Sequence, residues 1–91
     1  MPRPRKIRKL SHSPDTTYFK PQGIPMKELQ VINLSHEELE AIRLKYIEDL
    51  DQNACAEKMQ TSQSTFQRIL TSANKNIAKA LVQGYAIKII K

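Results

Sequence analysis

The chain has 91 residues, of which 40% are hydrophobic and 5% aromatic, and a net charge of +6. This length fits one small domain with a modest aliphatic core, so neither a deep enzymatic pocket nor a cofactor is expected. No apolar run reaches the roughly 18 residues of a membrane-spanning helix, and the single cysteine excludes an internal disulfide, so we expect a cytoplasmic protein.

Residues 1–27 contain all five prolines, and we expect an arm without regular structure there. Proline lacks a backbone N–H donor and biases the preceding residue toward extended conformations. The arm begins with five basic residues and no acid: Arg3, Arg5, Lys6, Arg8 and Lys9. Two roles are open for it, namely insertion into a DNA minor groove or unspecific attraction to a polyanion.

The segment after the arm is expected to be a domain over residues 28–91. Residues 28–34 are rich in β-branched side chains and indicate a short strand. A helix is expected over residues 36–48, because Ser35 and Glu38 have the spacing of a capping box. Its buried stripe is predicted to contain Leu39, Ile42, Leu44, Tyr46 and Ile47.

Two more helices are expected, over residues 52–59 and 63–83. Asp51 and Ser62 are the N-cap residues, and Gly84 is the left-handed residue that ends the second of these helices. The inner face of the long helix is predicted from steps of three and four residues to contain Phe66, Ile69, Leu70, Ala73, Ile77, Ala80 and Leu81.

The tail over residues 85–90 alternates and indicates a second short strand. It could pair with residues 28–34 or with a second chain. The predicted fold class is therefore all-α: a small helical bundle with an extended basic arm and short flanking strands.

The helices predicted over 52–59 and 63–83 are separated by only three residues, "QTS". Such a tight turn favours a steep crossing, which is helix-turn-helix geometry. Cys55, Met59, Phe66 and Ile69 are predicted to fill the wedge between the two helices. Ala56 is small enough to let them approach closely.

If Phe66 and Ile69 point inward, the polar side chains of the third helix point outward and can meet DNA. Glutamine can form paired hydrogen bonds to adenine, and arginine can do so to guanine. The candidate base-reading residues are Gln63, Ser64, Gln67 and Arg68. The candidate contacts to the DNA backbone are Ser62, Thr65, Thr71, Lys75 and Lys79. An ordinary solvated helix face is the competing interpretation, and the position directly after a tight turn favours the functional one.

The distribution of charge supports a polyanionic partner. Residues 1–14 carry a net charge of +5 and residues 58–91 a net charge of +6, with no acid in either segment, whereas residues 15–57 carry −5. Such segregation suits nucleic acid held between a basic arm and a basic helix face, with the acidic segment turned away.

Five runs in this order resemble the small prokaryotic family known as domain of unknown function 134, or uncharacterised protein family 0251. They are "MPRPRK", "FKPQGIP", "ELEAIRL", "QNACAEKMQTSQSTFQRIL" and "ANKNIAKALVQGYAIKI". Proteins of that family are predicted DNA-binding proteins whose helix-turn-helix is similar to sigma-factor region 4. The resemblance covers nearly the whole chain and implies a helical DNA-binding core with a role in transcription.

Four positions depart from the pattern of that family. Cys55 stands where alanine is usual, Gln60 where glycine is usual, Thr61 where an apolar residue is usual, and Asn74 where a basic residue is usual. Gln60 is therefore expected to need a left-handed backbone conformation at some energetic cost, and Asn74 to weaken one phosphate contact.

Other kinds of site are disfavoured by the sequence. His12 and His36 have no partner at metal-ligand spacing, so no metal site is expected. Cys55 lies on an inward face and is expected to be an inert buried thiol rather than a nucleophile. Glu37, Glu38 and Glu40 are expected to form a solvated helix face.

The leading hypothesis is a transcriptional regulator that binds double-stranded DNA sequence-specifically, as a homodimer. One recognition helix offers few base contacts, whereas two copies on half-sites give useful specificity. The alternative is a protein-interaction module that docks on RNA polymerase or another regulator through residues 37–57. RNA binding is disfavoured because few aromatic residues are available for stacking.

Overall fold

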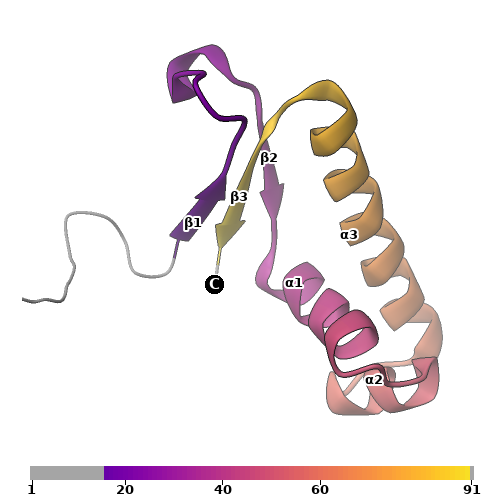
Figure 1. The fold of residues 1–91 in the computed structure, drawn as a ribbon. Helices are drawn as coiled ribbons and strands as arrows, with labels where there is room; N and C mark the ends of the chain where they lie inside the picture. Colours follow the sequence, from indigo (N-terminus) through magenta and orange to yellow (C-terminus); the bar gives the residue numbers. More distant parts are fainter. Residues whose placement is uncertain (1–15, 91) are drawn as a thin grey trace, which may run out of the picture.

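The computed structural model describes residues 16–90. Its elements are β1 (Thr16–Phe19), the 3₁₀-helix η1 (Met26–Glu28), β2 (Val31–Leu34), α1 (His36–Ile42), the π-helix η2 (Arg43–Ile47), α2 (Gln52–Lys58), α3 (Gln63–Gln83) and β3 (Ala86–Ile90). Figure 1 shows the three strands at one end of the molecule and α2 with the start of α3 at the other, connected by the long helix α3.

The strands form one mixed sheet in the order β1-β3-β2. In this sheet β3 runs antiparallel to β1, with Phe19 opposite Ile87, and parallel to β2, with Leu34 opposite Ile89. The all-α prediction is therefore wrong, and the protein has a small α/β fold. The sequence indicated two of the three strands, near residues 28–34 and 85–90, but it missed β1 and treated the strands as short additions to a helical bundle, because they are only four or five residues long.

The prediction that residues 1–27 lack regular structure is wrong for β1 and η1. The run "TTYF" of β1 has β-branched and aromatic residues, but the prolines on either side masked this signal. The basic arm residues Arg3, Arg5, Lys6, Arg8 and Lys9 lie outside the described residues. The sequence leaves two pairings open for the last strand, and the structure has the one with residues 28–34, since β3 pairs with β2.

Because β3 is the central strand, both of its edges are hydrogen-bonded within the chain. A second chain therefore cannot pair with the backbone of β3, which removes the other pairing that the sequence leaves open for this strand. The side chains of Leu34 and Ile89 pack on one face of the sheet against Ala73 of α3, and they form a small second core there.

The first helix begins as predicted but ends differently. Ser35 and Glu38 form the capping box, with the Glu38 N–H donating to Ser35 Oγ at 3.1 Å and the Ser35 N–H donating to Glu38 Oε1 at 2.9 Å. From Arg43 the chain continues as the π-helix η2. The wider turn shifts the side chains around the axis, so Tyr46 and Ile47 are 55% and 74% exposed. Their predicted burial is wrong.

Glu38 also connects α1 to α3. Its Oε2 accepts hydrogen bonds from Ser72 Oγ at 2.6 Å and from Asn76 Nδ2 at 3.1 Å. Partial burial would by itself raise the pKa of Glu38, but these bonds and those from Ser35 outweigh it and lower the pKa below 4.5. The ionised carboxylate is therefore the form that holds the two helices together.

The wedge between α2 and α3 is filled as the sequence predicted. Cys55, Ala56, Phe66 and Leu70 are buried together with residues of α1 and η2, and Met59 and Ile69 pack against them. The Cys55 Sγ donates to the Leu50 carbonyl oxygen at 3.6 Å, and burial raises the pKa of the thiol. An inert structural cysteine is consistent with this environment.

The long helix occupies the predicted residues, with Ser62 as N-cap and Gly84 in the left-handed conformation at its end. One predicted core residue is wrong, because Leu81 is 75% exposed. Near the C-terminus of α3, Ala80 is the buried residue. Leu81 follows it and lies about 100° further around the helix, so its side chain points away from the core. No helix among residues 16–90 is long and apolar enough to span a membrane.

The turn between α2 and α3 contains strained backbone at Gln60, whose φ is 57°. Its N–H donates to the Glu57 carbonyl oxygen, and the next N–H, that of Thr61, donates to the Ala56 carbonyl oxygen. These hydrogen bonds occupy carbonyl oxygens at the C-terminal end of α2, and both can form only if Gln60 adopts the left-handed conformation. A left-handed Gln60 was expected, because glycine is usual at this position in the family that the sequence resembles.

Replacing Gln60 with glycine should stabilise the protein by about 0.5–1 kcal/mol, because glycine adopts positive φ without the steric cost of a Cβ atom. Thermal or urea unfolding would measure the change. Gln60→Ala is the matched control, since alanine removes the exposed side chain but keeps the Cβ atom. Equal stability of the glycine and alanine variants would contradict backbone strain at this turn.

The Glu38 contacts should make stability depend on pH. Because the folded-state pKa is lowered, the stabilisation is present above the unfolded-state value and is lost as pH falls through 4.5 toward the lower folded-state pKa. At pH 7 we expect Glu38→Gln to cost about 1–2 kcal/mol, and this difference should shrink in acid. Denaturant unfolding across this pH range would measure it.

The control is Glu37→Gln in the same helical turn, because the Glu37 carboxylate makes no side-chain hydrogen bond within residues 16–90. This variant should follow the wild-type pH profile. A cost for Glu38→Gln that stays constant from neutral to acid pH would contradict the role of the ionised carboxylate.

Candidate nucleic-acid interface

The first turn of α3 is built by the residues directly after the strained turn. Ser62 has extended backbone, and its Oγ accepts the Thr65 N–H at 3.1 Å, which starts the helix at Gln63. The remaining N–H groups of this turn and the positive end of the helix dipole favour an anion in front of the helix.

Burial of Phe66 determines which side of α3 faces solvent. This side chain is 0% exposed, and Leu70 and Ala73 continue its inward face along the helix. Ser64, Gln67 and Arg68 lie on the other side of the helix, which is solvent-exposed. Gln63 is also exposed, but it lies at the start of the helix beside α2, on the side of Phe66. The structure therefore leaves all four candidate base readers accessible at the start of α3.

The candidate backbone contacts are distributed along the same helix. Ser62, Thr71, Lys75 and Lys79 are exposed, and Thr65 is half-buried. The hydroxyl of Ser62 lies 2.9 Å from Thr65 Oγ1 and 3.2 Å from Ser64 Oγ, in addition to capping the helix. These short contacts give Ser62 and Thr65 a structural role at the start of α3.

A shallow hollow lies on the exposed side of α3, lined by Gln67, Arg68, Thr71, Ser72 and Lys75. Gln67 Nε2 donates to Thr71 Oγ1 at 3.2 Å, and Arg68 Nη2 lies 3.4 Å from Thr65 Oγ1. Sequence reasoning missed Ser72 as a lining residue. Its hydroxyl already donates to Glu38, so it shapes the wall of the hollow rather than offering a free donor.

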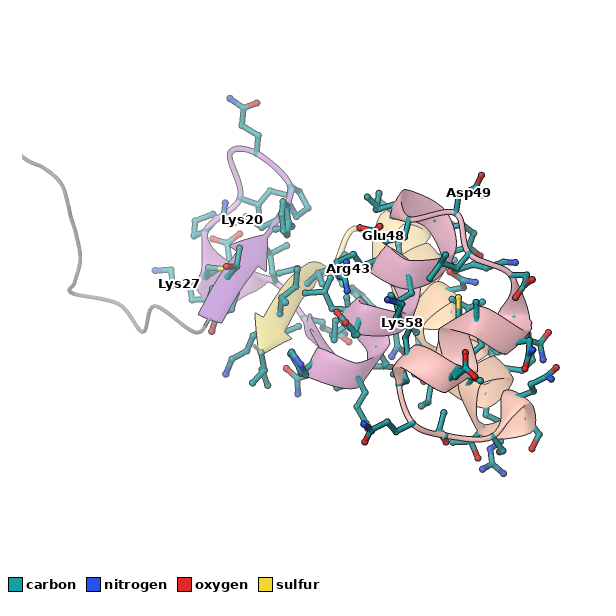
Figure 2. All side chains as sticks on the ribbon, turned by 90° about the horizontal axis from the view of Figure 1, so that it is seen from below. Lys20, Lys27, Arg43, Glu48, Asp49 and Lys58 are labelled. Atoms are coloured by element: carbon teal, nitrogen blue, oxygen red, sulfur yellow. The ribbon has the colours of Figure 1, made fainter. Side chains whose placement is uncertain are left out.

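The basic side chains of α3 form no ion pair with a carboxylate of residues 16–90. Within residues 16–90 both ion pairs are made by Arg43, at 2.8 Å to Glu40 and 3.1 Å to Glu48. Figure 2 shows Arg43 and Glu48 beside each other on the surface. These pairs raise the pKa of Arg43 and lower that of Glu40. Arg68, Lys75 and Lys79, by contrast, have no carboxylate of the described chain within 4.0 Å.

Two residues of α2 that the sequence analysis did not select lie beside this face. Gln52 Nε2 donates to the Gln63 carbonyl oxygen at 3.3 Å, and Asn53 Oδ1 accepts from Gln63 Nε2 at 3.1 Å. The sequence did contain a signal for these contacts. Both amides directly follow the N-cap Asp51 and so lie in the first turn of α2, which helix-turn-helix geometry can bring close to the start of the next helix.

The remaining candidates lie elsewhere. Asn74 Nδ2 donates to the hydroxyl of Tyr46 at 3.0 Å, so this side chain connects α3 to η2. The five arm residues lie outside the part of the chain that the structure describes. Within that part, no group of three or more histidine, cysteine or acidic side chains is placed to hold a metal ion.

Comparison with known proteins gives a match over the whole chain. Residues 1–91 match the family described as "Protein of unknown function DUF134". UPF0251 proteins of Halothermothrix orenii and Caldanaerobacter subterraneus are 51% and 54% identical, over 97% and 98% of this chain. A UPF0251 protein of Clostridium botulinum is 53% identical over 98% of it.

The chain spans 65%, 75% and 57% of the length of these three relatives. These relatives are therefore longer than the 91 residues considered. No solved structure matches the chain.

Proposed function

The chain belongs to the DUF134 family of proteins of unknown function, and we propose that it binds double-stranded DNA with the first turns of α3 in the major groove. The observation that carries this proposal is the exposed polar start of α3, where Ser64, Gln67 and Arg68 lie away from the buried Phe66 and Gln63 is exposed beside α2. A helix fits the major groove, where amide and guanidinium groups can each form two hydrogen bonds to one base.

The phosphate contacts are proposed to come from the cations further along α3. Lys75 and Lys79 are exposed and have no carboxylate partner within the described chain, and Thr71 adds a hydroxyl beside Lys75. Such contacts fix the register of a protein on the duplex without reading sequence. From sequence alone, the arm residues Arg3 and Arg5 are a second proposed contact.

The proposed role is that of a regulator of transcription that acts in the cytoplasm and has no enzymatic activity. Docking on RNA polymerase or on another regulator is the alternative function. The two differ in their response to salt, because neutralising phosphates releases counterions from DNA.

We further propose that a second copy of the chain is the partner on DNA, through the C-terminal end of α3. Leu81 and Val82 are 75% and 85% exposed there, and Leu81 lines an apolar hollow together with Phe19 and Ile87. Gln67 and Val82 are about 22 Å apart along the helix axis. Two copies in contact at Val82 can therefore separate their reading ends by the ~34 Å between successive half-sites.

Salt dependence tests DNA binding directly. If α3 contacts about five phosphates, the logarithm of affinity for duplex DNA should fall with the logarithm of salt concentration with a slope near −4 to −5, and Lys75→Ala should make the slope shallower by about 0.9. Fluorescence anisotropy would measure both.

Lys27→Ala is the control, because it removes the same charge beside the sheet, at the other end of the molecule, and it should leave the salt slope unchanged. A flat wild-type slope would favour the protein-interaction alternative.

Base reading by Arg68 predicts a different response. Arg68→Ala should lose about 1–3 kcal/mol of discrimination at one base pair, whereas Lys75→Ala should weaken binding to all sequences alike. Affinities for a selected duplex and its single base-pair variants would distinguish the two. Equal losses on every sequence with Arg68→Ala would show that Arg68 contacts the backbone.

The dimer surface can be tested without changing the reading face. Val82→Glu should shift the sedimentation of the protein, alone or on a two-site duplex, from dimer toward monomer, because a charge replaces exposed apolar surface in the contact. Gln83→Glu adds the same charge one residue away and should remain dimeric. A wild type that sediments as a monomer and binds DNA one copy at a time would contradict this surface.

A further inference from the structure

The first residue of α3 is held by a side chain of α2. Gln63 Nε2 donates one hydrogen bond to Asn53 Oδ1 at 3.1 Å, and the Gln63 main-chain carbonyl accepts from Gln52 Nε2 at 3.3 Å. Asn53 and Gln63 are exposed and Gln52 is half-buried, and Gln63 makes no other side-chain hydrogen bond within residues 16–90. The contact is therefore not part of the buried core.

This contact couples the orientation of the Gln63 amide to that of Asn53. In the structure the Asn53 oxygen accepts from the nitrogen end of Gln63, and turning over the Gln63 amide alone would place two oxygens against each other. With one N–H bound to Asn53, the Gln63 Oε1 and one N–H stay free. An acceptor and a donor on the same amide are what adenine needs in the major groove, because its N6 amino group donates and its N7 accepts.

The bond also lowers the conformational cost of recognition. A free glutamine side chain at the surface loses rotamer entropy when a partner fixes it. Because Asn53 already fixes the far end of Gln63, part of this cost is met before DNA arrives. A pre-oriented side chain discriminates better between bases than one that can rotate to suit each of them.

We propose that Asn53 is a positioning residue that orients Gln63 for an adenine at the leading end of the reading face. This inference rests on the proposed DNA-binding function and deepens it by assigning a base to Gln63. Asn53 acts through Gln63 and need not touch the base itself.

The test measures base preference, with a pool of short duplexes with a randomised centre as the probe. Sequences bound by the wild type are identified, and affinities are then measured for the selected duplex and its single base-pair variants. Gln63→Ala identifies the base pair that Gln63 reads. Asn53→Ala should reduce discrimination at that same base pair roughly threefold to tenfold, with an unchanged salt slope, because it removes orientation and no cation.

Asn53→Asp is the matched variant, since its carboxylate keeps an acceptor for Gln63 Nε2 but adds a negative charge near DNA. It should weaken binding to all duplexes alike and retain the preference for adenine. The double variant Gln63→Ala with Asn53→Ala should lose no more discrimination than Gln63→Ala alone.

Two results would overturn the assignment of Asn53: unchanged discrimination in Asn53→Ala, or an equal loss of affinity on every sequence, which would place Asn53 on the DNA backbone. In both cases DNA binding by the wild type would still stand. A wild type that enriches no duplex and binds none would overturn both proposals together. Thermal unfolding of Asn53→Ala separates these results from a folding defect, because an exposed substitution of this kind should leave the unfolding temperature nearly unchanged.

Discussion

The burial of Phe66 between α2 and α3 is the constraint on which the candidate site depends. A side chain with no exposed surface fixes the rotation of α3 about its own axis, and this rotation decides which residues remain in solvent. The three-residue turn leaves little freedom to change it, and Gln60 accepts a left-handed backbone to keep the turn short. Gln63, Gln67 and Arg68 are exposed as a consequence of this packing.

The rest of the fold holds α3 in place along its length. Near the middle, Glu38 joins α1 to Ser72 and Asn76, so the capping box of one helix also connects it to another. At the same level Ala73 packs against Leu34 and Ile89 of the sheet, and one turn further on Ile77 packs against the same cluster. The proposed reading end thus projects from a helix that is fixed at several points, which favours a rigid presentation of the amide and guanidinium groups.

Helices and caps were predictable because their signals are local. Ser35, Asp51, Ser62 and Gly84 each act on the few residues beside them, and all four have the roles that the sequence indicated. The complete sheet was not predictable, because three α-helices separate β1 and β2 from β3 along the chain and a pairing over that distance leaves no local signal. Tyr46 and Ile47 were misplaced for a related reason: the π-helix shifts them out of the period on which their assignment relied.

The sequence by itself determined the elements of the proposed site: the tight turn, the inward Phe66 and the polar side chains one turn away from it. These depend on spacing along a single helix, which a linear pattern encodes directly. The tertiary structure decided the α/β class, the central position of β3 and the partners of individual side chains. Gln63 shows the difference, since its place as the first residue of α3 follows from the N-cap Ser62. Its bond to Asn53 depends on how α2 packs across α3, which is a relation between residues that local sequence patterns do not specify.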